Sequence, residues 1–386
     1  MEDYLNFINN LMSTEAEEEK KEEINESEIK KIVEDVGFKY ERLIGKGGYG
    51  RVVEVKKDNR IFAIKIIFER ETKNNKKDIK IEPIKELRGK NIVKINFEYT
   101  ELLNQDKEKK YYFYAMECSF IGCLNDFHRF INNKLIFKGA FVEKVGDNLT
   151  RFFVLQMVTA LKTLYQGNFV HYDIKPDNML IRKGLNLKLI DFSFLTKLSG
   201  ESGKIPGGTL GYITPEYFNK TNSHKNETLR KQDYFAIGMT IFFLKYGIGS
   251  LNDFSIKDDE NAFNKHKIVI ESIENARDKI KNQLFQDEDF TQFLCNLIQL
   301  RPEDRLDFEE IIRNKWLNKN TKEIQKMYNI NESDEDNIVL ELQKSDFLIN
   351  NRKYYRKNFD KKYSNEIENK KYRQLKKGKF KFGKTN

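Results

Sequence analysis

Two polar segments in the middle of the chain constrain its fold more than any other feature. The first reads HYDIKPDN and spans residues 171–178, and the second begins at Asp191 of the sequence LIDFSF. A helical pattern at 149–164 precedes the first segment, and the apolar run 187–190 predicts a strand that leads into Asp191. The fold must therefore bring a loop that follows a long helix next to the end of a strand.

The side chains of these two segments suit phosphoryl transfer. Asn178 and Asp191 offer oxygen ligands, which hard divalent cations prefer, so we expect Mg²⁺ here, with Mn²⁺ as the alternative ion. Asp173 can orient an attacking hydroxyl and accept its proton, and Lys175 can neutralise phosphate charge during the transfer. Asp and Asn are also common in turns and caps, but the spacing of these residues favours the chemical interpretation.

A glycine-rich segment, GKGGYGRV, places Gly45, Gly47 and Gly50 in a GxGxxG pattern. In a dinucleotide-binding unit a helix would follow the glycines, whereas here the sequence predicts a strand. We therefore expect a hairpin flap whose glycine backbone approaches phosphates closely. Lys65 lies in the next predicted strand, 61–68, where a buried ammonium group is costly unless it meets an anion.

The spacing of apolar residues changes along the chain from a strand pattern to a helix pattern. Short β-rich runs occupy 51–55, 61–68 and 111–116, and 3.6-residue periods occupy 149–164, 232–246, 290–300 and 308–316. This order predicts an α+β fold with two lobes. We expect a small β-rich N-terminal lobe at about 37–117 and a larger, mainly helical C-terminal lobe at about 118–317.

The two ends of the chain carry opposite charge. Residues 1–36 hold twelve acids and four lysines, and they read as a polar lead-in that can be solvated. Residues 318–386 lose apolar density, and residues 350–386 hold fourteen Lys or Arg against three acids. This basic extension could bind an anionic partner. The net charge of +9 reflects lysine that is abundant throughout, so we do not expect nucleic acid as a partner.

No segment of the sequence predicts passage through a membrane. The longest apolar run, 234–244, has 11 residues, and a span of the bilayer needs ~20. The N-terminus lacks a secretory signal, and Cys118, Cys123 and Cys295 match neither a disulfide framework nor a zinc site. We therefore expect an intracellular protein, in the cytoplasm, the nucleus or both.

The motifs described above resemble those of the eukaryotic protein kinase superfamily, over about residues 37–317. Four further segments are similar to motifs of that family: MECS (116–119), GTLGYITPE (208–216), DYFAIG (233–238) and RPEDR (301–305). The resemblance implies transfer of the γ-phosphoryl group of ATP to Ser or Thr hydroxyls of protein substrates, because Lys175 in DIKPDN is of the Ser/Thr type. The alternative is a pseudokinase, a nucleotide-binding or scaffold module with the same fold.

The resemblance also assigns individual roles. The catalytic residues would be Asp173, Lys175 and Lys65, and Glu82 would pair with Lys65, with Glu86 as the alternative partner. Met116 would be the gatekeeper beside the adenine ring. The full set expected around the adenine comprises Ile44, Val52, Ala63, Met116, Glu117, Cys118, Ser119 and Leu180.

Three structural contacts are implied in the same way. Asp233 would support the backbone of residues 171–178, called the catalytic loop below. Glu216 would pair with Arg305. The hydroxyl of Thr209 would contact the catalytic loop.

Two positions depart from the family pattern. Tyr172 replaces the arginine of the HRD motif, which normally receives a phosphate carried by the segment after Asp191, so we expect no strict dependence on such phosphorylation. Ser193 replaces the glycine of DFG. A side chain here is expected to make any excursion to positive φ costlier.

Overall fold

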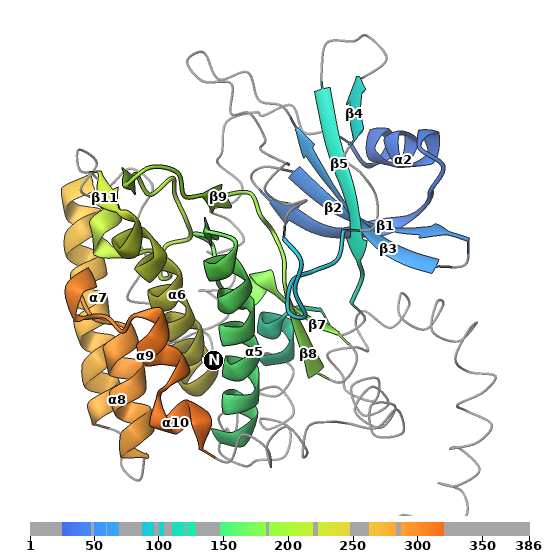
Figure 1. Cartoon of the computed structure of the whole chain (residues 1–386). Coiled ribbons are helices and arrows are strands. Elements are labelled where there is room, and N and C mark those ends of the chain that lie inside the picture. Colours follow the sequence, from blue (N-terminus) through green and yellow to red (C-terminus); the bar gives the residue numbers. More distant parts are fainter. Residues whose placement is uncertain are drawn as a thin grey trace, which may run out of the picture. The chain divides into compact units, whose positions relative to one another are not determined.

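The computed structural model describes twelve stretches of the chain: 25–47, 50–58, 60–68, 87–95, 100–103, 110–119, 122–128, 147–182, 185–218, 223–247, 262–282 and 287–319. The chain divides into two compact units. The first comprises residues 1–78 and 94–118, and the second comprises residues 79–93 and 119–386. Strands dominate the described part of the first unit and helices dominate that of the second (Figure 1).

The first unit contains a five-stranded sheet in the order β1-β2-β3-β5-β4, in which every neighbouring pair is antiparallel. The strands are β1 (Lys39–Gly47), β2 (Gly50–Lys57), β3 (Arg60–Phe68), β4 (Thr100–Leu103) and β5 (Lys110–Glu117). The strands predicted at 51–55, 61–68 and 111–116 are confirmed as β2, β3 and β5.

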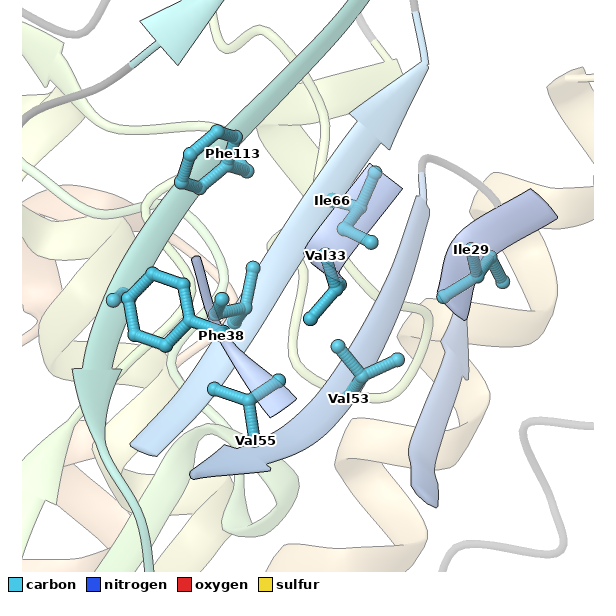
Figure 2. Packing of buried hydrophobic residues seen from close by; sticks show 9 residues of the cluster. Ile29, Val33, Phe38, Val53, Val55, Ile66 and Phe113 are labelled. Carbon is cyan, nitrogen blue, oxygen red and sulfur yellow. The ribbon is translucent and has the colours of Figure 1, made fainter. Parts of the chain in front are cut away.

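One face of this sheet is apolar because of its register. Val53 on β2 lies opposite Ile64 on β3, and Ile66 on β3 lies opposite Phe113 on β5. Since side chains alternate along a strand, these residues point to the same side of the sheet. They form a buried cluster together with Val55 and other apolar side chains (Figure 2).

Helix α2 (Glu26–Asp35) packs into this cluster. Its residues Ile29 and Val33, one turn apart, are 2% and 1% exposed. Asn25 caps the helix by accepting a hydrogen bond from the backbone N–H of Glu28 at 2.9 Å. The expectation of a solvated lead-in is therefore wrong for this helix, because the helical spacing of its apolar residues gives it one buried face.

Six helices dominate the described part of the second unit. They are α5 (Asp147–Gln166), α6 (Asn226–Tyr246), α7 (Ala262–Lys281), α8 (Glu288–Leu297), α9 (Phe308–Ile312) and α10 (Lys315–Asn318). Every side chain of α6 from Lys231 to Leu244 is buried, so this helix forms the centre of the unit. None of the helices that the structure describes is long and apolar enough to cross a membrane.

The helical predictions hold with two differences. The patterns at 149–164 and 232–246 correspond to α5 and α6, and the pattern at 290–300 ends earlier, since α8 stops at Leu297. The single helix predicted at 308–316 is wrong. It is divided into α9 and α10 because the side chain of Asn314 accepts hydrogen bonds from the backbone N–H groups of Trp316 and Leu317, and so starts a new helix.

Short strands complete the second unit and hold its loops. They are β6 (Phe169–Val170), β7 (Met179–Arg182), β8 (Asn186–Leu189), β9 (Thr196–Lys197), β10 (Ser202–Gly203) and β11 (His224–Lys225). Residues 87–93, which precede β4 in the chain, also belong to this unit. Asn91 donates from Nδ2 to the carbonyl of Leu187 at 2.7 Å and accepts from the N–H of Leu189 at 2.8 Å. These bonds attach the segment around Asn91 to β8.

A buried ion pair joins two distant parts of the second unit. Arg305, which is 1% exposed, donates from Nη1 and Nη2 to the two carboxylate oxygens of Glu216 at 2.6 and 2.8 Å. This bidentate geometry confirms the implied pairing of Glu216 with Arg305. It fixes the end of the segment that leads from Asp191 to Glu216.

Candidate active site

The catalytic loop, 171–178, and the segment that begins at Asp191 lie side by side. Asn178 ends a short 3-10 helix (Pro176–Asn178) directly before β7, and β7 pairs with β8, which leads to Asp191. The backbone N–H of Ile190 donates to the carbonyl of Asn178 at 2.9 Å. The loop after α5 and the end of the strand thus meet, as the sequence predicts.

The carboxylate of Asp173 is held by three side chains. Its Oδ2 accepts from Nδ2 of Asn178 at 2.8 Å and lies 3.1 Å from Nζ of Lys175. Its Oδ1 accepts from the hydroxyl of Thr209 at 2.6 Å, and that hydroxyl accepts from Nζ of Lys175 at 2.6 Å. The contact of Thr209 with the catalytic loop is therefore confirmed. An ordered carboxylate beside a fixed ammonium offers a proton acceptor and a counter-charge for phosphate in one place.

A buried carboxylate holds the backbone that carries Asp173. Asp233 on α6 accepts from the backbone N–H groups of His171 and Tyr172 at 2.7 and 2.9 Å, which confirms its implied role. Tyr172 adopts a left-handed backbone with φ of 64°, which costs a non-glycine residue about 1–2 kcal/mol. Burial raises the pKa of Asp233 to about 7, and the two N–H donors oppose this rise.

His171 links the catalytic loop to the residue before Asp191. Its Nε2 lies 3.2 Å from the carbonyl of Ile190, and its Nδ1 accepts from the backbone N–H of Asp173 at 3.3 Å. An imidazole with one donor and one acceptor nitrogen is neutral, and the hydrogen-bond partners assign the proton to Nε2. The ring is fully buried, and this burial lowers its pKa to about 4.

We expect His171 to make the protein less stable in acid. Its folded-state pKa of about 4 lies below the ordinary 6.5, so the unfolded chain binds the proton more readily. The contribution is fully present above pH 6.5 and is lost as the pH falls towards 4. It amounts to about 3 kcal/mol of unfolding free energy.

Urea unfolding of the wild type and of His171→Asn at several pH values isolates this contribution. Asp233 has a raised pKa and an opposite pH dependence, but it is present in both proteins and cancels in the difference. The stability advantage of the wild type should shrink between pH 6.5 and 4. Parallel curves over that range would contradict the assignment of a neutral His171.

Asp191 occupies a left-handed position, and Ser193 stabilises it there. The φ of Asp191 is 60°, a conformation that Asp and Asn tolerate better than most residues. The hydroxyl of Ser193 donates to Oδ1 of Asp191 at 2.6 Å, and the N–H of Ser193 lies 3.3 Å from the same oxygen. The expected cost of a positive φ at Ser193 does not arise, because its own φ is not positive.

The donors of the two segments fit a hard divalent cation. Asn178 uses its amide nitrogen towards Asp173, at 2.7 Å from the carbonyl and 2.8 Å from Oδ2, and this orientation leaves the amide oxygen as the atom that could bind a cation. The carboxylate of Asp191 follows one residue after the backbone bond between Ile190 and Asn178. An amide oxygen and a carboxylate are ligands that Mg²⁺ accepts.

Four of the expected residues lie on the second face of the sheet in the first unit. Val52 lies opposite Lys65, and Ala63 lies opposite Met116, so these four side chains share the face that α2 does not cover. Lys65 is 7% exposed, so its side chain is buried on this face.

Gly45, Gly47 and Gly50 of the glycine-rich segment lie on β1 and β2, whose antiparallel pairing agrees with the predicted hairpin. Gly45 lies opposite Val52, and Gly47 lies opposite Gly50. A Cβ atom at Gly50 would stand 2.1 Å from the carbonyl oxygen of Ile66, so only glycine fits there. The third glycine of the pattern therefore has a packing reason within the sheet.

The residues expected around adenine are divided between the two units. Ile44, Val52, Ala63, Met116, Glu117 and Cys118 belong to the first unit, and Ser119 and Leu180 belong to the second. Glu117 accepts from the backbone N–H of Lys94 at 3.0 Å, and Ser119 donates to the carbonyl of Ile181. Glu82 and Glu86 lie outside the described residues.

The hydrogen bond from Ser193 to Asp191 was not predicted from the sequence, where Ser193 is considered only as a replacement for glycine. A serine two residues after an aspartate can donate to that carboxylate in a local turn. This spacing was the available signal.

Comparison with known proteins gives the class of this chain. A family model described as a protein kinase domain matches residues 38–317. The chain therefore belongs to the protein kinase family, and the predicted α+β fold, with a β-rich first part and a mainly helical second part, is confirmed.

Three curated relatives illustrate the similarity. The serine/threonine-protein kinase atg1 of Dictyostelium discoideum is 26% identical over 298 residues, which cover 73% of this chain and 39% of that protein. MRCK beta of Rattus norvegicus, a serine/threonine-protein kinase, is 25% identical over 217 residues, or 54% of this chain and 12% of that protein. MRCK alpha of Homo sapiens is 25% identical over 259 residues, which cover 63% of this chain and 14% of that protein. The chain thus spans less than half the length of these relatives.

Proposed function

We propose that this protein is a serine/threonine-protein kinase that transfers the γ-phosphoryl group of ATP to hydroxyl groups of protein substrates. The observation that carries the proposal is the network around Asp173. Asn178, Lys175 and Thr209 all bond to its carboxylate, and Asp191 follows the strand beside Asn178. The relatives named above are serine/threonine-protein kinases, which supports the choice of acceptor.

Each residue has a definite task in this proposal. Asp173 orients the acceptor hydroxyl and accepts its proton, and Lys175 neutralises the phosphate as it moves. Asn178 and Asp191 would hold Mg²⁺, or Mn²⁺ in its place. When bound, this cation neutralises charge on the phosphate oxygens of ATP. Lys65, on the second face of the sheet in the first unit, would pair with phosphates of the nucleotide.

The alternative of a pseudokinase rests on Tyr172, on Ser193 and on the open choice of the glutamate that pairs with Lys65. Tyr172 and Ser193 have local roles that are compatible with catalysis. Tyr172 is buried in an apolar cluster, and Ser193 donates to the carboxylate of Asp191. Neither residue removes a ligand or the proton acceptor, so we favour the active enzyme.

Incubation of the purified protein with labelled ATP, Mg²⁺ and a generic basic protein tests the proposal. We expect incorporation that requires the cation, stops on addition of EDTA and is lost in Lys65→Met. Lys30→Met, at an exposed position of α2, is the matched control and should retain the rate. Phosphoamino-acid analysis should show phosphoserine or phosphothreonine. Mainly phosphotyrosine, or equal incorporation by Lys65→Met, would refute the proposal.

Several finer expectations remain proposals. We propose that Glu82 pairs with Lys65, with Glu86 as the alternative. We also propose that the kinase domain occupies residues 37–317 and that residues 1–36 and 318–386 are extensions of it. The basic C-terminal extension would bind an anionic partner. We also propose a location in the cytoplasm, the nucleus or both.

A further inference from the structure

Tyr172 is part of an apolar cluster that joins the catalytic loop to the segment after Asp191. The residue is 2% exposed. The buried members of the cluster are Val170, Tyr172, Leu198 and Leu229, and the half-buried side chains of Phe194 and Ile205 pack against them. We call these six residues the apolar clasp. It unites β6 and the catalytic loop, residues 194–205 and helix α6.

Hydrogen bonds also attach residues 194–205 to the elements that contribute to the clasp. Asn168 accepts at its carbonyl from the N–H of Leu198 at 2.8 Å, and its Nδ2 donates to the carbonyl of Leu198, also at 2.8 Å. Further along, β10 pairs with β11, so Ser202 lies opposite Lys225. Nδ2 of Asn226 donates to the carbonyl of Gly200 at 2.9 Å. The segment is thus attached at Leu198 and again at residues 200–202.

Two glycines beyond the clasp pass close to its members. A Cβ atom at Gly208 would stand 2.7 Å from the carbonyl oxygen of Tyr172, and one at Gly207 would stand 2.7 Å from the ring of Phe194. Both glycines have φ values of about 155°, which side chains rarely adopt. Thr209 follows directly, and its hydroxyl donates to Asp173 at 2.6 Å.

We propose that the apolar clasp positions Asp173 by ordering residues 194–209 against the catalytic loop. Tyr172 and Leu198 are then positioning residues. When the clasp is packed, Gly207 and Gly208 keep their close approach and Thr209 reaches the carboxylate of Asp173. The effect on phosphoryl transfer rests on the proposed function, whereas the ordering of the segment does not.

The clasp works without charge. All six side chains lack an ionised group, and burial together with the nearby Asp233 raises the pKa of Tyr172, which therefore stays neutral. The hydroxyl of Tyr172 is buried without a hydrogen-bond partner among the described residues. Such a hydroxyl contributes nothing favourable, so phenylalanine should serve as well. In the family pattern, a phosphate on the segment after Asp191 binds the arginine of the HRD motif. Here apolar packing around Tyr172 attaches the segment instead.

The test compares Leu198→Ala with Tyr172→Phe. Hydrogen exchange of peptides that cover 196–209 reports order, and steady-state kinetics report transfer. We expect Leu198→Ala to lose protection in this segment and to lower kcat at least tenfold, with the KM for ATP within about threefold of the wild type. Tyr172→Phe should match the wild type in both measurements.

Ile280→Ala, at the end of α7 and fully buried, is the control for a general loss of stability. It should not expose 196–209 selectively. Wild-type protection and rate in Leu198→Ala would overturn the proposal, as would a loss in Tyr172→Phe equal to that in Leu198→Ala. A loss of protection with an unchanged kcat would overturn the link to Asp173. If the wild type transfers no phosphate, the proposed function fails, and hydrogen exchange still decides whether the clasp orders the segment.

A phosphate on this segment should be dispensable if the clasp orders it. We expect protein treated with phosphatase, and checked by mass spectrometry, to retain its rate within tenfold. The triple variant Thr196→Ala, Ser199→Ala, Ser202→Ala should do the same, since the alcohols it removes lie outside the clasp. A larger loss in either sample would show that the clasp is insufficient.

Discussion

Asp191→Asn should reduce the rate of phosphoryl transfer at least ~100-fold while the protein stays folded. The change removes the negative charge that is proposed to bind the cation, and it keeps the shape of the side chain. Asparagine tolerates the left-handed backbone that Asp191 adopts with φ of 60°, and its amide oxygen can still accept from the hydroxyl of Ser193. We therefore expect the variant to lose transfer rate and to keep its stability.

Asp58→Asn is the matched control for this experiment. Asp58 is exposed and also left-handed, with φ of 48°, but it lies in the turn between β2 and β3. Rate measurements and thermal unfolding without nucleotide should be made on both variants. If the midpoint of Asp191→Asn falls by much more than ~5 °C, Asp191 has a structural role instead.

Val33→Asp should strongly reduce the stability of the first unit. Val33 is 1% exposed in the cluster between α2 and the sheet, so a carboxylate there would be buried among apolar side chains (Figure 2). Burying such a group without a partner costs several kcal/mol, and we expect the unfolding free energy of the first unit to fall by at least about 3 kcal/mol. Urea unfolding followed by circular dichroism, with limited proteolysis, measures this loss.

Lys31→Asp introduces the same carboxylate at an exposed position of the same helix, and it should cost less than about 1 kcal/mol. Equal losses in the two variants would mean that α2 does not stabilise the sheet. A shortened chain offers a second measurement. A protein that begins at residue 25 should keep the stability of the full chain, and one that begins at residue 37 should not.

Strands β2, β3 and β5 and helices α5 and α6 could be predicted because their apolar periods are unbroken, whereas β1, β4 and α7 were not predicted. Helix α2 was missed because acids dominate residues 1–36, although Ile29, Ile32 and Val33 have helical spacing. The division of 308–316 was missed because Asn314 acts through a local cap. Average composition hides such caps, whereas the position of a single side chain decides them.

The meeting of the catalytic loop with Asp191 could also be predicted, because two motifs at a fixed spacing require it. The packing around Tyr172 could not. The clasp draws Leu198, Ile205 and Leu229 from parts of the chain that no local pattern connects. The neutral form of His171 likewise depends on burial and on two hydrogen-bond partners, which only the fold supplies.

The bidentate bond between Glu216 and Arg305 also sets an order of events during synthesis. The two residues are 89 positions apart. A ribosome that adds 5–20 residues per second produces Arg305 roughly 4–18 s after Glu216. During that interval the carboxylate has no arginine, and burying it alone would be costly. The segment that ends at Glu216 must therefore stay hydrated on the nascent chain, and the second unit closes only after the RPEDR sequence has left the ribosome.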